Sequence, residues 1–254
     1  MRLRSLLVMP WVAAVLIVAG AVGAQEPAGS PKTSNTGENP SQASEPGDAS
    51  EKSTTPAKEM EKEKADEGEG KSEKDKEAKP KKAKVERATF AGGCFWSIEA
   101  IFERIPGVKS AVSGFAGGVV PSPDYDTVCT GETGHAESVR VTYDPDVVSY
   151  EDLLEVFWAA HDPTTLNAQG EDFGTQYRSV IFFHSEEQRK AALKSYRQLT
   201  DAGVFGRPIV TDLVPMNAFY PAERYHQDYY RNHRTNEYCQ RVIAPKLRKL
   251  KLIK

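Results

Sequence analysis

The sequence predicts an α+β sandwich, in which helices cover a mixed β-sheet, over residues 87–254 of the 254-residue chain. Apolar residues that alternate with polar ones indicate half-buried strands, and apolar residues spaced by three and four indicate helices with one buried face. The two patterns follow each other in the order β-α-β-β-α-β-α-β, which is typical of this fold class. The region is long enough for one domain with its own core.

The first strand, helix and strand of this domain are separated by glycine-containing pairs. A strand is predicted over residues 88–91, and a Gly-Gly pair interrupts it before a helix over 94–105. Four apolar side chains would share the buried face of this helix: Ile98, Ile101, Phe102 and Ile105. A Pro-Gly pair ends the helix, and the next strand is expected over 108–115.

The remaining elements follow from the same two periods. The predicted strands are residues 138–143, 177–183 and 209–213. The predicted helices are residues 150–161, 185 to about 200, and 221–232. Ser185 and Gln188 have the spacing of a capping box, which fixes the start of the second of these helices. A long polar loop over 162–174 precedes the strand at 177–183.

The first 24 residues have the pattern of a secretory signal peptide. Arg2 and Arg4 precede an apolar run over residues 6–22, and small residues lead to the polar chain that begins at Gln25. We therefore expect cleavage after Ala24 and a secreted or periplasmic, extracytoplasmic location. The run is also close to the roughly 17–25 residues that span a bilayer, so an uncleaved N-terminal anchor is the alternative. The protein would contact a membrane only if this segment is retained.

Residues 25–86 are predicted to be a disordered, charged linker. They contain no Phe, Trp, Tyr, Ile or Leu but 12 Lys and 15 acidic residues, so they cannot bury enough apolar surface to offset chain entropy. The domain that follows carries a net charge of −2, which argues against nucleic-acid binding. Three cysteines without a C-x-x-C pair exclude a disulfide scaffold and a Cys-rich zinc site.

Cys94 is the most informative residue of the domain. It follows two glycines and would lie in the first turn of a helix, where free N–H groups and the helix dipole favour a thiolate. Phe95 and Trp96 come too early to belong wholly to the buried stripe, and they would wall a small apolar cavity beside the sulfur. A buried structural cysteine, with Phe95 and Trp96 in the core, explains the same local pattern.

Two further clusters place polar side chains at the starts of strands. Glu137 precedes one strand, with Tyr125 and Cys129 upstream, and a carboxyl group buried there would act as a general acid because burial raises its pKa. Asp172 and Tyr177 lie on a loop that leads to another strand. Taken separately, each cluster is also explained by solvated or half-buried turn residues.

Four ordered blocks of sequence together resemble the A-type peptide methionine sulfoxide reductases. The blocks are GGCFWSIEA at 92–100, TGHAESVRVTYDP at 133–145, HDPTTLNAQGEDFGTQYRSVIF at 161–182 and YHQDYY at 225–230. The resemblance covers residues 87–245. It implies the ferredoxin-like two-layer α/β sandwich of that family, and reduction of methionine-(S)-sulfoxide in oxidised proteins and as the free amino acid.

The resemblance also implies a role for each matching residue. Cys94 matches the nucleophile, Glu137 the acid that protonates the sulfoxide oxygen, and Cys239 the recycling cysteine of a mobile tail. The residues that match substrate-binding positions are Phe95 and Trp96 for the methyl pocket, Tyr125 and Tyr177 for the sulfoxide oxygen, and Asp172 for substrate and water. The resemblance implies no metal and no bound cofactor, with a thioredoxin-like protein or another dithiol as the external reductant.

The chain departs from the family pattern in its tail and beside the Asp172 loop. The tail lacks the glycine usual before Tyr238, which puts the reach of Cys239 in question, and Glu171 replaces a common Asn. Cys129 is expected to be a buried, non-catalytic thiol. The residues expected to have only structural or packing roles are His135, His161, His226, Tyr225, Tyr229 and Tyr230.

Two other function classes stay open on the residues alone. A cysteine hydrolase or acyltransferase would pair Cys94 with a histidine, although no convincing His–Asn or His–Asp arrangement is present in the sequence. A non-enzymatic, anchored binding module would leave all three cysteines inert.

Overall fold

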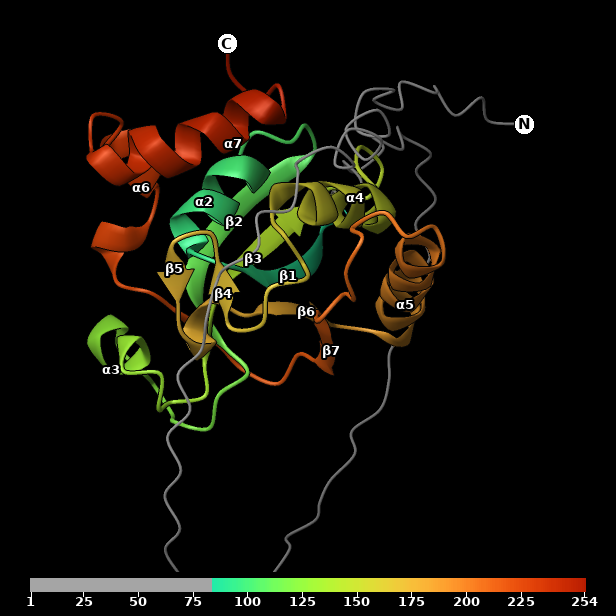
Figure 1. Ribbon diagram of the computed structural model, residues 1–254, viewed down its shortest axis with the longest axis horizontal. Helices are drawn as coiled ribbons and strands as arrows, with labels where there is room; N and C mark the ends of the chain where they lie inside the picture. The colour runs from blue at the N-terminus through green and yellow to red at the C-terminus, as the bar shows by residue number, and fades with distance from the viewer. Residues whose placement is uncertain (1–83) are drawn as a thin grey trace, which may run out of the picture. The chain divides into compact units, whose positions relative to one another are not determined.

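A six-stranded mixed β-sheet forms the centre of the protein in the computed structural model, which describes residues 84–254 (Figure 1). The strands lie in the order β7-β6-β1-β3-β2-β8, with β6 and β7 parallel and the other neighbours antiparallel. The strands are β1 (Glu86–Gly92), β2 (Val108–Ala116), β3 (Ala136–Tyr143), β6 (Ser179–Phe183), β7 (Asp212–Pro215) and β8 (Phe219–Pro221). The predicted α+β class is confirmed. The predicted signal segment (1–24) and nearly all of the predicted linker (25–86) lie outside the described residues.

The four central strands are connected as β-α-β-β-α-β. Helix α2 (Phe95–Phe102) joins β1 to β2, and helix α4 (Tyr150–Ala160) lies between β3 and β6. Because β3 separates β1 from β2, and β1 separates β3 from β6, each β-α-β unit is split by another strand. Since β1 and β3 run antiparallel, the end of β1, where α2 begins, lies beside the start of β3.

Aromatic side chains fill the layer between the sheet and the two helices. Phe90 of β1 is fully buried, and its ring stacks on Phe102 of α2 at 5.1 Å and on Phe157 of α4 at 5.0 Å between centroids. Helix α5 (Glu186–Asp201) packs against α4 and against the sheet edge formed by β6 and β7 (Figure 1). The contacts of Phe90 fix β1, and therefore the start of α2, against the helical layer.

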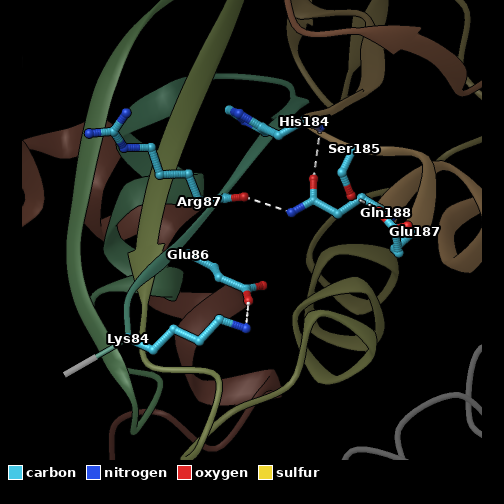
Figure 2. A pocket seen from close by; sticks show the side chains of 7 residues that line it. All are labelled: Lys84, Glu86, Arg87, His184, Ser185, Glu187 and Gln188. Carbon is cyan, nitrogen blue, oxygen red and sulfur yellow. Dashed lines mark hydrogen bonds and ion pairs between the residues drawn. The ribbon is translucent and has the colours of Figure 1, made fainter. Parts of the chain in front are cut away.

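A depression of about 420 Å³ lies where β1 begins beside the start of α5 (Figure 2). Gln188 crosses it, since its side chain accepts from the backbone N–H of His184 and donates to the carbonyl of Arg87. Ser185 caps α5 as predicted, but Gln188 is engaged in these other bonds, so the predicted capping box is not completed. The residues that surround Cys94 do not line this depression.

Short elements occupy the segments that the sequence indicated as loops. The predicted polar loop 162–174 contains a small hairpin of β4 (Ala168–Gln169) and β5 (Asp172–Phe173). Helix α3 (Tyr125–Cys129) and the 3₁₀ turn η1 (Thr175–Tyr177) lie near it. Within residues 84–254, none of the helices has both the length and the apolar character needed to cross a bilayer.

The prediction of one continuous helix over residues 221–232 is wrong. The segment consists of the end of β8, a 3₁₀ turn η2 (Arg224–His226) and the short helix α6 (Tyr229–Asn232). The Gln227 side chain bonds to both the N–H and the carbonyl of Ser113, which anchors this point to β2. Asp228 then takes a left-handed conformation with φ 54°, which a continuous helix cannot contain.

The C-terminal segment is helical. The Asn236 side chain accepts from the backbone N–H groups of Tyr238 and Cys239, at 2.9 and 3.4 Å, and so caps the helical segment. The π-helix η3 (Cys239–Ile243) continues into α7 (Ala244–Lys249). The buried face of this helical segment consists of Cys239, Ile243, Leu247 and Leu250. Their spacing of four, four and three residues was readable in the sequence.

Replacing Phe90 with Ala is expected to destabilise the domain by about 3–5 kcal/mol, because the cavity would lie between the rings of Phe102, Tyr150 and Phe157, on all of which Phe90 stacks. Urea denaturation followed by circular dichroism measures the loss. Phe173, which is 75% exposed, is the matched control, and its replacement with Ala should change stability by less than about 0.5 kcal/mol. Equal losses at the two positions would contradict the role of Phe90 in the core.

Candidate active site

Cys94 lies at the N-cap of α2, directly after the end of β1. Gly93 precedes it in a left-handed conformation with φ 88°, and a Cβ atom there would come within 2.6 Å of the Gln169 side chain. Only glycine fits this turn without strain. The Cys94 side chain is 7% exposed, so only a small part of its surface is accessible to solvent.

Glu137 brings a carboxyl group to the same helix start from β3. Its Oε2 accepts a hydrogen bond of 2.9 Å from the backbone N–H of Phe95, the residue after Cys94. Burial raises the pKa of Glu137 to about 8, and the nearby Asp172 carboxylate contributes, while the Phe95 N–H acts in the opposite direction. Glu137 is therefore mostly protonated at neutral pH and can serve as an acid.

The expected thiolate at Cys94 is not favoured in the substrate-free protein. Burial raises the pKa of the Cys94 thiol well above its ordinary value, and the charges of Glu137 and Asp172 act in the same direction. Hydrogen bonds to Tyr238 and to the backbone of Trp96 lower the pKa, but they do not outweigh burial. The helix N-terminus is thus insufficient to ionise Cys94, and the resting sulfur is a thiol.

Two phenols lie close to the Glu137 carboxyl group. Tyr125 starts α3. Tyr177 was predicted at the start of a strand, but it lies in the 3₁₀ turn η1. Burial raises the pKa of each phenol, and the charge of Glu137 raises it further. Both therefore keep their protons and can donate hydrogen bonds to an oxygen atom bound near Glu137.

An aromatic wall stands beside Cys94. Trp96 stacks on Tyr229 of α6 with 3.7 Å between ring centroids, and its Nε1 donates to Nδ1 of His226 at 3.1 Å. Phe95 is almost completely buried and packs against Tyr125 and His226, so it forms the buried part of the aromatic wall. Trp96 is only partly buried, and it presents its ring to the site.

Asp172 is held by the C-terminal segment. The Tyr238 hydroxyl donates to Oδ2 of Asp172 at 2.7 Å, and Tyr238 also hydrogen-bonds to Cys94. Next to it, Glu171 forms an ion pair with Arg241 of η3. Glu171, one of the departures from the family pattern, thus joins the β4–β5 hairpin to the helix that carries Cys239.

The other two cysteines differ from the expectations. Cys239 is fully buried in η3, not on a loose tail, while Cys129 is exposed rather than buried. Burial raises the pKa of Tyr229, and charge on Cys239 or Cys94 would raise it further, so both sulfurs lie in the neighbourhood of this ring. All three cysteines are free thiols.

The structure brings the predicted acid, phenols and Asp172 together around Cys94, buries Cys239 in the neighbouring η3, and adds three residues. His226, Tyr229 and Tyr238 line the site, although the first two were expected only to pack. The YHQDYY block contained the signal for His226 and Tyr229. Within residues 84–254, no group of three His, Cys, Asp or Glu side chains is arranged to hold a metal ion.

The sequence and the fold that carry this site are similar to those of known proteins. The profile of a family described as peptide methionine sulfoxide reductase matches residues 86–253. The chain belongs to the peptide methionine sulfoxide reductase family. It is an oxidoreductase that reduces methionine-(S)-sulfoxide in oxidised proteins.

Individual relatives support the family assignment over most of their length. The chain is 54% identical over 167 residues to the peptide methionine sulfoxide reductase MsrA of Polynucleobacter asymbioticus, covering 66% of this chain and 88% of the relative. It is 54% identical over 169 residues to that of Deinococcus radiodurans, covering 66% and 82%. Among solved structures, reduced Mxr1 from Saccharomyces cerevisiae superposes with a TM-score of 0.58 at 36% identity, covering 65% of this chain and 94% of Mxr1.

Replacing Glu137 with Gln is expected to stabilise the domain increasingly as the pH rises from 4.5 to about 8. The folded wild type retains a proton that the unfolded chain releases above 4.5, so wild-type stability falls across this range, whereas Gln does not titrate. The advantage should grow by at most about 1.4 kcal/mol per pH unit. Urea unfolding at several pH values measures it, and a pH-independent difference would contradict the raised pKa.

Proposed function

We propose that Cys94 and Glu137 act together on the sulfoxide as nucleophile and acid. The observation that carries this proposal is the hydrogen bond between Glu137 and the Phe95 N–H, which fixes a protonated carboxyl group beside the Cys94 sulfur. A sulfoxide sulfur becomes electrophilic when its oxygen receives a proton, so both groups are needed on the same side of the substrate.

The steps balance in atoms and electrons. The Cys94 sulfur attacks the sulfoxide sulfur and loses its own proton as Glu137 gives a proton to the oxygen, while Tyr125 and Tyr177 donate hydrogen bonds to that oxygen. This attack forms an S–S bond between Cys94 and the substrate. The substrate S–O bond then breaks and the hydroxyl oxygen bonds to the Cys94 sulfur, while the S–S bond breaks and its electron pair leaves with methionine, so that Cys94 becomes a sulfenic acid. Glu137 recovers the proton released from Cys94, so the site returns to its starting charge.

Recycling requires a second thiol. The Cys239 sulfur attacks the Cys94 sulfenic acid, a disulfide forms and water leaves, and an external dithiol such as a thioredoxin-like protein reduces the disulfide. The packing of η3, which begins at Cys239, against α2, which begins directly after Cys94, supports the pairing. Because Cys239 is buried in η3, this step requires the helical segment to open locally.

The alternative functions gain no support from the site. Among the described residues, His161 bonds to Phe157 and Ser179, and His226 bonds to Trp96, so neither is placed as a base for Cys94. A hydrolase would need such a pair. The ferredoxin-like interpretation of the sandwich is supported by the order β6-β1-β3-β2 of the central strands.

We also propose an extracytoplasmic enzyme, with residues 87–254 as the catalytic domain after a signal segment (1–24) and a disordered linker (25–86). The charged start, apolar run and small residues before Gln25 support this placement. The linker's lack of large apolar residues supports a spacer between the N-terminal segment and the enzyme.

Replacing Cys94 with Ser should abolish methionine formation, whereas replacing Cys239 with Ser should allow one methionine per chain and block thioredoxin-dependent turnover. Mass spectrometry of the wild type after one turnover should detect a Cys94–Cys239 disulfide. Cys129→Ser is the control and should retain turnover. Thioredoxin-dependent reduction by the Cys94→Ser variant would contradict the assigned nucleophile.

N-terminal sequencing of the mature protein should give Gln25 as its first residue, because the small residues before it suit signal peptidase. Fractionation of the producing cells should then find the enzyme outside the cytoplasm. A mature chain that begins at Met1 and sediments with membranes would instead establish the anchored form.

A further inference from the structure

Two side chains of α2 and that of its C-cap residue form a stripe that faces α6: Trp96, Glu99 and Glu103. They are spaced by three and four residues, so they lie on one side of the helix. Trp96 stacks on Tyr229, and Glu103 forms an ion pair of 3.2 Å with Arg231. Glu99 lies between these two contacts and has no part in the reaction described above.

Glu99 is a buried carboxyl group whose partners are backbone N–H groups. It is 2% exposed, and it accepts hydrogen bonds from the backbone at Asp228 and Tyr229, the start of α6. Burial raises its pKa to about 7, and these two hydrogen bonds oppose the rise. A buried acceptor is costly unless it is bonded, so Glu99 and the start of α6 depend on each other.

Helix α6 cannot hold its position by local interactions alone. It has four residues, too few to form a stable helix without tertiary contacts. Asp228, which precedes it, has φ 54°, a conformation that disfavours non-glycine residues. The Asp228–Arg231 ion pair of 3.1 Å is exposed and contributes little. The position of α6 is therefore set by the anchor of Gln227 on Ser113, directly before it, and by the contacts to α2.

We propose that Glu99 is a positioning residue for substrate binding, which holds the start of α6 so that Tyr229 lies flat against Trp96. The Trp96–Tyr229 pair then forms a rigid apolar wall beside Cys94 for the substituents on the sulfoxide sulfur. This inference rests on the proposed function, because it assigns the wall to the substrate of Cys94. Glu99 does not touch the reacting atoms, and it acts through Tyr229.

Single-turnover kinetics separate this role from catalysis. Pre-reduced enzyme is mixed with increasing methionine sulfoxide, and the methionine formed gives a half-saturating concentration and a limiting rate. Replacing Glu99 with Met, which keeps the volume but removes the acceptor, should raise the half-saturating concentration about tenfold and leave the limiting rate within about twofold. Glu99→Gln keeps one acceptor and should give a smaller rise, about threefold.

A double-mutant cycle tests the route through Tyr229. Tyr229→Leu should itself raise the half-saturating concentration, and adding Glu99→Met should raise it no further, since both changes remove the same wall. The matched control is Glu155→Met at an exposed position of α4, which should behave as the wild type. Multiplying effects in the double variant, or an unchanged half-saturating concentration in Glu99→Met, would overturn the proposal.

If the Glu99→Met variant does not fold, hydrogen exchange of the Glu99→Gln variant still tests the proposal. In Glu99→Gln, exchange of the amides at 228–233 should accelerate while exchange in β1 and β3 stays unchanged, and equal protection in the two proteins would contradict the proposal. Loss of methionine formation by the wild type itself would refute the assigned reaction instead, so the two failures are distinguishable.

Discussion

One hydrogen bond, from the Phe95 N–H to the Glu137 carboxyl group, determines the geometry of the site. The first N–H groups of a helix have no intrahelical partners. In α2, the Phe95 N–H donates to Glu137, and the next N–H, that of Trp96, donates to the Cys94 sulfur. Nucleophile and acid are therefore fixed to adjacent peptide units. The sheet enforces the arrangement, because β1 delivers the helix start and the neighbouring antiparallel strand β3 delivers the carboxyl group.

Because the Phe95 N–H is donated to Glu137 and not to Cys94, the resting site is neutral rather than reactive. Giving the Phe95 N–H to Glu137 removes one donor that would otherwise stabilise a Cys94 thiolate, and burial then keeps the thiol protonated. Glu137 and the two phenols are also protonated. Charge separation begins only when a sulfoxide oxygen arrives to receive a proton. A thiol of this kind is protected from chance oxidation, since the thiolate is the form that reacts.

The sequence predicted the elements that build this geometry because their patterns are local. The alternation in β3 and the apolar stripe of α2 depend on residues close in the chain, and they placed Cys94 and Glu137 at element starts. The position of Tyr229 was not predictable, because it depends on Gln227 bonding to Ser113 and on the Glu99 carboxyl group, both far away in the sequence. The thiol pKa was missed for a related reason: the amount of burial is a property of the whole fold.

The C-terminal helix shows how recycling is coupled to closure of the site. Tyr238 bonds to Asp172 and Cys94, so the residue before Cys239 occupies the space beside the nucleophile while Cys239 faces the core. In the proposed recycling step, the helical segment must open locally so that the Cys239 sulfur can reach the space beside Cys94 that Tyr238 occupies. A π-helix contains an extra residue in one turn and is frequent at functional sites. Cys239 begins the π-helix, so the widened turn and the thiol that must move coincide in the chain.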